Sequence, residues 1–378
     1  MKVSILSPNL SSNNLGRSYL LAQLLERNYD VEIIGPVLGD GIWDPLAGEY
    51  DYKSITMNDL AHEFPLKYSK FSNKVTGDII YAMKPITTSF GWGLLYSKIN
   101  DKPLVLDIDD WESGFFYNQN NSRLLTHIKH APLMIKLSAL NYRHMLEYLY
   151  TIADQITVSN EFLKKRFGGT IIPHVRDTDV FDPAQYNKQA ARSELDIPSD
   201  KFIVLFSGTP RPHKGLEDLI DAVNKVENPD IYVIIMGTHK SEYVDSLKSR
   251  AGDKIIFRGR QPFTTLPKWI AASDTYVIPQ RDSYSTRGQL PAKLFDAMAM
   301  GKPIVATSVS DIPNILDGCG TVVSPNSPDE LGAAIQELYR NPVLRDSHGQ
   351  QARKKCIEKY SYDSVAPRLV KLIDSIVS

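Results

Sequence analysis

The chain has 378 residues, with 43 Lys and Arg against 44 Asp and Glu, a formal net charge of −1, and two cysteines. This length is too great for one ordinary core and predicts two domains, while the balanced charge gives no reason to expect nucleic acid as a partner. A strand-like start instead of a secretion signal, and the lack of a long apolar run, predict a cytoplasmic protein without disulfides or a membrane-spanning helix.

Short apolar runs alternate with amphipathic stretches along the whole chain, a pattern typical of parallel sheets covered by helices on both faces. A polar, proline-marked stretch at 181–198 divides two such series and is the predicted linker. The strands expected before it are Val3–Leu6, Val31–Ile34, Asp78–Tyr81, Leu104–Leu106, Gln155–Val158 and Thr170–Ile172. The strands expected after it are Phe202–Phe206, Tyr232–Met236, Ile255–Phe257, Thr275–Ile278, Pro303–Val305 and Thr321–Val323.

Two loops of the first half carry candidate functional residues. The small, polar loop 9–16 leads into a predicted helix, and Gly16 with Arg17 could meet a phosphate or an acceptor there, or could simply cap the helix. A later predicted strand ends in Asp107-Ile-Asp109-Asp110. Because clustered carboxylates raise the pKa of one member, Asp109 with Asp110 are candidates for an acid or base. The alternative is a cation-binding Asp-x-Asp pair at Asp107 and Asp109.

The segment 124–150 is rich in apolar residues with Lys129, Lys136 and Arg143 between them. Such a basic amphipathic helix could lie on an anionic membrane, but packing against the first sheet is the favoured interpretation. His174, in a turn that follows the last strand of the first half, is interpreted as structural rather than as a ligand.

The stretch 202–220 predicts an anion site. A buried strand leads into a loop with Gly208 and Gly215, and a helix follows at Leu216. Glycine lets the backbone approach a ligand, and the start of a helix favours negative charge. Arg211 and Lys214 add cations where a phosphate would lie, although a solvated loop with two surface cations is the plainer interpretation.

A second segment, 289–307, makes a resemblance specific. Together with the loop after Phe206 it resembles the C-terminal half of family 4 glycosyltransferases of the GT-B fold, which carry a Gly-Arg…Lys-Gly phosphate loop and a later Glu, seven residues, Glu element. The likeness covers nearly the whole chain and is stronger after about residue 200. Supporting stretches are 2–8, 154–160, 172–181, 257–263, 272–279 and 307–316.

The resemblance implies an α/β protein of two doubly wound, Rossmann-like domains that face each other across a cleft. Residues 1–183 would form the acceptor-side domain and residues 184–361 the domain that binds the nucleotide sugar. Residues 362–378 would form a helix that packs back on the first domain, the alternative being an ordinary terminal helix of the second.

The resemblance also implies roles for residues of the second half. Lys214 and Arg211 would neutralise the diphosphate of the donor, although the family's arginine would stand at Thr209, directly after Gly208. Asp296 takes the place of the second glutamate and would accept the ribose hydroxyls.

Gly288 takes the place of the first family glutamate, so Asp282 is our candidate for the contacts to the sugar hydroxyls. The backbone N–H groups of Gln289 and Leu290, expected to open the next helix, would bind the distal phosphate. Arg260 would read the base, or would be a surface arginine.

The implied activity is transfer of a sugar from a UDP-, GDP- or ADP-sugar to a hydroxyl of a glycan, a lipid-linked acceptor or a small molecule, with retention of configuration. We expect no cofactor, no metal and a cytoplasmic location, with peripheral contact to the inner face of the membrane as an alternative, and leave the oligomeric state open. The alternative is a catalytically silent subunit that binds a nucleotide sugar. The sequence offers neither the acid-base set of a nucleotide-sugar epimerase nor the Gly-x-Gly-x-x-Gly loop of a dehydrogenase.

Overall fold

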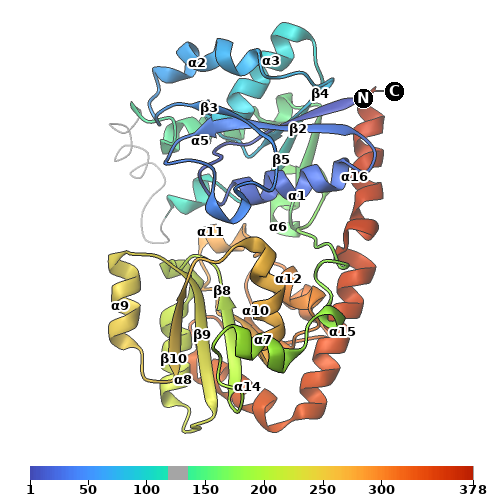
Figure 1. The fold of residues 1–378 in the computed structure, drawn as a ribbon. Helices are drawn as coiled ribbons and strands as arrows, with labels where there is room; N and C mark the ends of the chain where they lie inside the picture. The colour runs from blue at the N-terminus through green and yellow to red at the C-terminus, as the bar shows by residue number, and fades with distance from the viewer. Residues whose placement is uncertain (118–134, 378) are drawn as a thin grey trace. The chain divides into compact units, whose positions relative to one another are not determined.

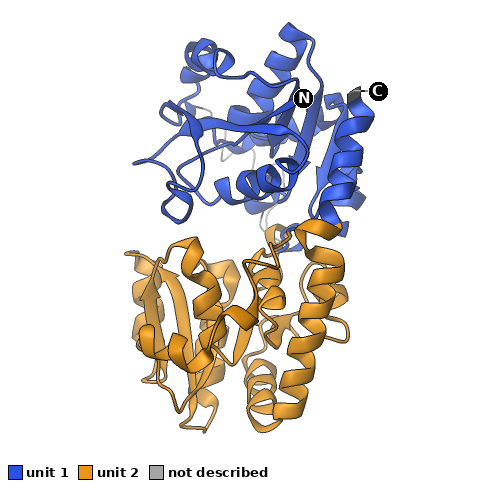
Figure 2. Cartoon of the chain, turned by 45° about the vertical axis from the view of Figure 1, so that its right-hand side comes forward, with its two compact units in different colours: residues 1–174, 287–290, 365–378 blue, residues 175–286, 291–364 orange. Residues whose placement is uncertain are grey.

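The structure is a computed structural model that describes residues 1–117 and 135–377 (Figure 1). The chain forms two compact units (Figure 2). Unit 1 comprises residues 1–174, 287–290 and 365–378, and unit 2 comprises residues 175–286 and 291–364. The domain boundary expected after residue 183 therefore lies inside unit 2.

Unit 1 is built on a seven-stranded parallel sheet with the order β3-β2-β1-β4-β5-β6-β7. The strand order runs outward in both directions from β1, so the crossover helices cover both faces. In the view of Figure 1, α1 lies below this sheet and α2 and α3 lie above it. The strands are β1 (Lys2–Leu6), β2 (Asp30–Val37), β3 (Tyr52–Thr56), β4 (Ile79–Met83), β5 (Leu104–Ile108), β6 (Gln155–Val158) and β7 (Thr170–Ile171). The helices are α1 (Leu15–Leu25), α2 (Glu63–Ser72), α3 (Trp92–Asn100), α5 (Leu140–Tyr148) and α6 (Glu161–Phe167).

Strand β3 is the element of this sheet that the sequence pattern did not predict. It is an edge strand that pairs only with β2, and Ile55 is its one buried residue. A strand with one apolar anchor lacks the continuous apolar run that marks the central strands of a parallel sheet.

Unit 2 is built on a six-stranded parallel sheet with the order β10-β9-β8-β11-β12-β13. Its main hydrophobic core lies between this sheet and helices α8 and α14, with Leu219, Val223 and Ile335 fully buried. The strands are β8 (Phe202–Ser207), β9 (Ile231–Thr238), β10 (Ile255–Gly259), β11 (Thr275–Ile278), β12 (Ile304–Thr307) and β13 (Thr321–Val323). The helices are α7 (Lys188–Glu194), α8 (Leu216–Lys225), α9 (Glu242–Arg250), α10 (Leu266–Ala272), α11 (Tyr284–Arg287), α12 (Lys293–Ala299), α13 (Ile312–Leu316), α14 (Pro328–Arg340) and α15 (Pro342–Tyr360).

The fold class expected from the sequence, two doubly wound parallel sheets, is confirmed. The linker is not: residues 181–198 include helix α7 and form part of unit 2. Arg192, on α7, is buried and pairs with Asp274 at 2.6 Å, which anchors this helix to the rest of unit 2.

Helix α16 (Tyr362–Val377) ends the described chain, and residues 365–378 belong to unit 1. The Tyr29 hydroxyl donates to Asp374 at 2.6 Å, and Arg368 donates to the carbonyl oxygen of Ile171 at 2.8 Å. These contacts join the end of the chain to the turn before β2 and to β7 of the same unit.

Candidate functional site

The loop after β8 places glycine backbone, without side chains, at the carboxyl end of the unit 2 sheet. Gly208 has a φ of 122° and Gly215 a φ of 67°, conformations that residues with a side chain rarely adopt. A Cβ on Gly215 would lie 1.8 Å from the carbonyl oxygen of Pro279, so a side chain has no room there. A Cβ on Gly237, after the core of β9, would lie 2.7 Å from the Gly208 carbonyl oxygen. The loop after β8 is therefore packed closely against the end of β9 at Gly208 and against the loop after β11 at Gly215.

The predicted phosphate-binding residues lie in this loop. Residues Pro212–Lys214 form a short 3-10 turn, η7, directly before α8. Lys214 is half-buried, and its charge acts on a second lysine, Lys293. Thr209 is half-buried and Arg211 is exposed. The structure thus brings Lys214 together with Lys293, and the roles of Thr209 and Arg211 stay predictions.

Lys293, which the sequence analysis did not single out, is the first residue of α12. Its ammonium nitrogen lies 3.7 Å from the centre of the Phe206 ring, and a Cβ on Gly208 would lie 2.8 Å from it. Within residues 1–117 and 135–377 it forms no hydrogen bond and no ion pair. Burial, followed by the charge of Lys214, holds the pKa of Lys293 well below its ordinary value, and Asp296 opposes this.

Asp296 lies almost one helical turn after Lys293 on α12 and is 3% exposed. Its carboxylate accepts a hydrogen bond from Nε of Arg176, while Nη1 of Arg176 donates to the carbonyl oxygen of Val175 at 2.7 Å. Burial raises the pKa of Asp296, and the charge and hydrogen bond of Arg176 work against that rise. The predicted contact of Asp296 with the ribose stays a prediction, and Arg176 is a partner that the sequence did not reveal.

The loop after β11, which carries Asp282, is tied to the phosphate loop. The Arg281 guanidinium donates to both Asp218 carboxylate oxygens, at 2.9 and 2.8 Å. The Arg281 backbone N–H donates to the carbonyl oxygen of His213 at 3.0 Å. Asp282 is therefore held next to residues that fix the start of α8, which is compatible with its predicted contact to the sugar but does not test it.

The expectation for Gln289 and Leu290 is wrong in one respect, because their backbone N–H groups do not open the next helix. Helix α12 begins at Lys293, and residues 287–290 belong to unit 1. Pro291 explains the late start, since a residue before proline is disfavoured in helical conformation. Leu290 is buried, and the Gln289 side chain donates to Oδ1 of Asp110 at 3.2 Å.

Gly288, at the place of the family's first glutamate, is packed against unit 1 residues. Its carbonyl oxygen accepts a hydrogen bond from Asn160 Nδ2 at 3.2 Å. A Cβ on Gly288 would lie 2.7 Å from the Cβ of Trp111. The position that holds glutamate in the family therefore has no space for a side chain here.

Gly16 in unit 1 and Arg260 in unit 2 are two further predicted site residues. Gly16 is in the first turn of α1, where an added Cβ would meet only a Trp43 ring atom at 3.8 Å. Arg260 is exposed and follows β10, the edge strand of the unit 2 sheet. Both assigned roles stay predictions.

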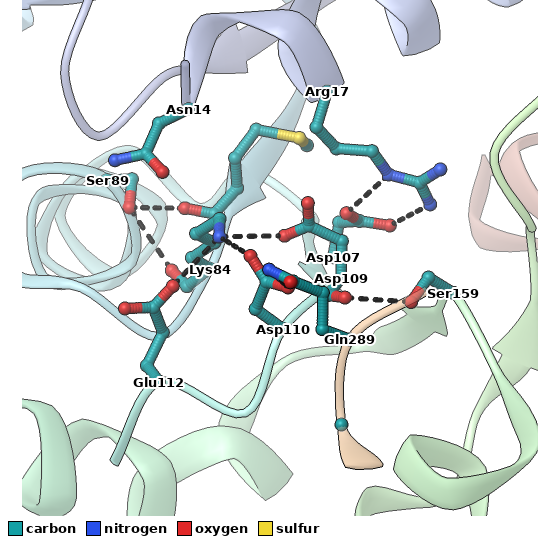
Figure 3. Close-up of polar contacts among 12 residues, drawn as sticks. Asn14, Arg17, Lys84, Ser89, Asp107, Asp109, Asp110, Glu112, Ser159 and Gln289 are labelled. Atoms are coloured by element: carbon teal, nitrogen blue, oxygen red, sulfur yellow. Dashed lines mark hydrogen bonds and ion pairs between the residues drawn. The ribbon is translucent and has the colours of Figure 1, made fainter. Parts of the chain in front are cut away.

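In unit 1, three carboxylates surround the ammonium nitrogen of Lys84, which directly follows β4 (Figure 3). This nitrogen lies 2.5 Å from Asp110, 2.8 Å from Glu112 and 3.3 Å from Asp109. Lys84 is 3% exposed and has a φ of 64°, a strained conformation for a lysine. Strain of this kind persists only where the surroundings enforce it and is common at functional sites.

The two candidate catalytic carboxylates have opposite electrostatic surroundings. Burial, with the charges of Asp110 and Asp107, raises the pKa of Asp109 from 3.8 to about 7, although Lys84 opposes the rise. Burial also disfavours the charged form of Asp110, but Lys84 and the hydrogen bond from Gln289 outweigh it and lower the pKa. Oδ1 of Asp109 is buried and forms the ion pair with Lys84, but it accepts no hydrogen bond from the residues that the structure describes. Asp109 is thus suited to hold or accept a proton near neutral pH, and Asp110 is suited to stay ionised.

Arg17 and Asp107 form a buried pair, which contradicts their candidate roles as ligands. Nε and Nη2 of Arg17 donate to the two Asp107 oxygens at 3.0 and 2.9 Å, and its other contacts go to the carbonyl oxygens of Ile172 and Pro173. Asp107 accepts a further hydrogen bond from Thr157 at 2.7 Å. Because the guanidinium and the carboxylate are used internally, neither a phosphate at Arg17 nor a cation between Asp107 and Asp109 fits the arrangement. In the described ranges, no group of three or more His, Cys, Asp or Glu is placed to hold a metal ion.

The segment considered for membrane contact lies partly outside the described residues, including Lys129. In its described part, Arg143 donates to the carbonyl oxygen of Ser138 at 3.0 Å and pairs with Glu112. His174, at the end of unit 1, is buried, and its charge favours the ionised form of Asp110. No helix among the described residues is both long and apolar enough to span a bilayer.

Lys84, Arg176 and Lys293 are the residues of the candidate site that sequence reasoning missed. Lys84 ends the run Ile79–Met83 just as Asp109 and Asp110 follow β5, so its place after a buried strand was the available signal. Lys293 is a lysine at the start of a helix whose other residues, apart from Asp296, are apolar, which is a comparable signal.

Comparison with solved structures defines the class of fold. The Anabaena protein Alr3699/HepE, in a structure with UDP-glucose, superposes with a TM-score of 0.76 at 17% identity, covering 99% of this chain and 100% of that one. At this identity the likeness concerns the fold alone, which is the two-domain, Rossmann-like arrangement of GT-B proteins.

Comparison of sequences finds similarity to glycosyltransferases. The family model described as Glycosyl transferases group 1 matches residues 201–341. A GDP-mannose-dependent monoacylated alpha-(1-6)-phosphatidylinositol monomannoside mannosyltransferase of Corynebacterium glutamicum is 25% identical over 62% of this chain and 65% of that protein. An uncharacterized glycosyltransferase of Methanocaldococcus jannaschii is 29% identical over 79% of this chain and 85% of that protein. The chain is thus similar to glycosyltransferases, and the family model is matched over residues 201–341.

Proposed function

We propose that the chain transfers a sugar from a nucleoside diphosphate sugar to an acceptor hydroxyl, with retention of anomeric configuration. The observation that carries this proposal is that Lys214 and Lys293 lie near Gly208, at the carboxyl end of the unit 2 sheet. Ligands of open α/β sheets bind at that end of the strands. The group 1 glycosyltransferase match covers the same residues.

The chemistry follows from the charges of each unit. As the bond between sugar and diphosphate breaks, negative charge grows on the leaving phosphate, and the Lys214 ammonium stabilises it. The sugar carbon gains positive charge, which the ionised Asp110 can offset. Asp109, with its pKa raised toward neutrality, can accept the proton of the attacking hydroxyl.

The donor and acceptor are proposed only as classes. The Anabaena structural neighbour was solved with UDP-glucose, and the Corynebacterium relative is named for GDP-mannose. Both donors share the nucleoside diphosphate, which is the part that Lys214 would bind. A UDP-, GDP- or ADP-sugar is therefore the proposed donor class.

The proposal is tested by incubating the protein with each nucleotide sugar, with and without candidate acceptors, and measuring released nucleoside diphosphate. Lys214→Ala should lower turnover about a hundredfold or more, because it removes a charge that acts mainly on the transition state. The variant should keep the wild-type circular dichroism spectrum and melting temperature. Undiminished sugar transfer by Lys214→Ala would refute the phosphate assignment, and donor binding without release under all conditions would favour the silent nucleotide-sugar-binding subunit.

A further inference from the structure

Unit 2 contains a lysine whose charge the surrounding protein does not balance. The described residues offer the Lys293 ammonium neither a hydrogen bond nor an ion pair. The carboxylate that acts on it, Asp296, already pairs with Arg176. A desolvated ammonium without a partner is costly, so its retention here requires an explanation outside ordinary packing.

The position of Lys293 points toward the phosphate loop. Its nitrogen would lie 2.8 Å from a Cβ on Gly208, so only the absence of a side chain at Gly208 leaves room for it. The Phe206 ring lies against the same nitrogen at 3.7 Å, which positions the ammonium at the end of β8. Lys214, in the loop that Gly208 opens, is near enough for its charge to act on Lys293. Lys293 also keeps some exposed surface, so a ligand can reach it.

We propose that Lys293 is a second phosphate-binding residue of unit 2, which forms an ion pair with the diphosphate of the nucleotide sugar when that group lies against Gly208. This inference rests on the proposed function, because it takes the donor diphosphate as the anion. It adds a residue from α12 to a site that the sequence assigned to the loop after β8.

Binding of the diphosphate should then favour the protonated form of Lys293. Without the anion, burial and the charge of Lys214 keep the pKa of Lys293 well below its ordinary value. Asp296, shared with Arg176, is the carboxylate that acts in the other direction. A diphosphate beside the nitrogen supplies negative charge and raises the pKa of Lys293 back toward its ordinary value, which favours the ammonium form.

The experiment uses isothermal titration calorimetry with inorganic pyrophosphate, a probe that does not depend on the base or the sugar. Wild type, Lys293→Met and a control, Lys225→Met, are titrated at pH 8 in two buffers of different ionisation enthalpy. Lys225 is a matched control because it is an exposed unit 2 lysine at the far end of α8. We expect Lys293→Met to weaken pyrophosphate binding about ten- to a hundredfold. Lys225→Met should bind as wild type does.

The proton count provides a second measurement. Wild type and Lys225→Met should take up more protons per bound pyrophosphate than Lys293→Met does. Subtracting the proton uptake of Lys293→Met from that of wild type cancels the protons that pyrophosphate itself gains or loses on binding. A circular dichroism melt checks that Lys293→Met is folded, and the proton uptake of wild type itself requires no variant.

The outcomes separate this inference from the proposed function. Equal pyrophosphate affinity and equal proton uptake in wild type and Lys293→Met overturn the role of Lys293 while leaving the Lys214 site intact. A wild-type protein that binds neither pyrophosphate nor any nucleoside diphosphate overturns both. Weaker binding in Lys293→Met together with the lost proton supports both.

Discussion

Lys84 in unit 1 and Lys293 in unit 2 are both lysines enclosed at the carboxyl end of a parallel sheet, and they differ in how their charge is balanced. Lys84 has three carboxylates within 3.3 Å, and these raise its pKa well above the ordinary value despite burial. Lys293 has no such partner among the described residues, and its pKa is lowered. A charge balanced by the protein organises the site around it, whereas an unbalanced one favours a ligand of opposite charge.

Removing the balanced charge should have the largest effect. Lys84→Met leaves Asp109, Asp110 and Glu112 buried beside one another without their shared cation. We expect the free energy of unfolding to fall by about 3–5 kcal/mol, measured by urea denaturation followed by fluorescence and circular dichroism. Unit 1 should lose its structure before unit 2 does.

The control for this prediction is Lys225→Met, which removes an exposed lysine paired with Asp329. Exposed pairs contribute little, so its unfolding curve should overlay that of wild type. A Lys84→Met protein as stable as wild type would show that the three carboxylates are protonated or hydrated. Lys84 would then no longer serve as the example of a charge that the protein balances.

Lys302 offers an intermediate case, because its partners are neutral. Its nitrogen donates to the carbonyl oxygens of Ala271 and Ser273 at 2.9 and 2.8 Å, and burial lowers its pKa to about 7. Lys302→Met should cost about 2 kcal/mol of unfolding free energy by leaving two carbonyl groups without donors. Pyrophosphate affinity should stay that of wild type, and a loss of affinity would mean that general loosening of unit 2 explains the Lys293 effect.

The pH dependence of stability tests the carboxylate side of the comparison. The folded-state pKa of Asp109 is raised from 3.8 to about 7, so folded Asp109 holds a proton that the unfolded chain has released. Its contribution to stability is therefore complete below pH 4 and is lost as pH rises toward 7. Between pH 5 and 7, wild type should lose about 1–2 kcal/mol relative to Asp109→Asn, measured by urea denaturation. Parallel pH profiles for the two proteins would contradict the raised pKa.

Much of the fold could be predicted because the central strands of a parallel sheet are recognisable in the sequence as short, continuous apolar runs. Strands β6, β11 and β13 have the expected bounds. The failures have local causes: β3 is anchored by Ile55 alone, and α7 in the expected linker is held by Arg192, whose contacts lie far away in the sequence. Edge strands, and connecting segments that pack against the sheet, depend on contacts with residues far away in the sequence, which a local pattern does not reveal.

The site was predictable where one loop carries it and not where the fold brings distant residues together. Gly208, Gly215 and Lys214 form one recognisable sequence pattern. Lys293 reaches that loop only because α12 starts after Pro291. The pairing of Arg17 with Asp107, across 90 positions, likewise turned two candidate ligands into an internal ion pair.

The smallest expected effect has the opposite sign and is the sharpest test of the difference between the two lysines. Lys293→Met replaces an unpaired, desolvated amine with an apolar side chain of similar length that can keep its contact with Phe206. Without ligand, the free energy of unfolding should stay the same or rise by up to about 1 kcal/mol, in contrast to the loss in Lys84→Met. The measurement is urea denaturation at pH 8 with and without pyrophosphate, since a ligand that binds only the folded state stabilises wild type more than a variant that has lost affinity. A clear destabilisation of ligand-free Lys293→Met would mean that Lys293 has a structural partner in the folded protein, and the two lysines would then belong to one class.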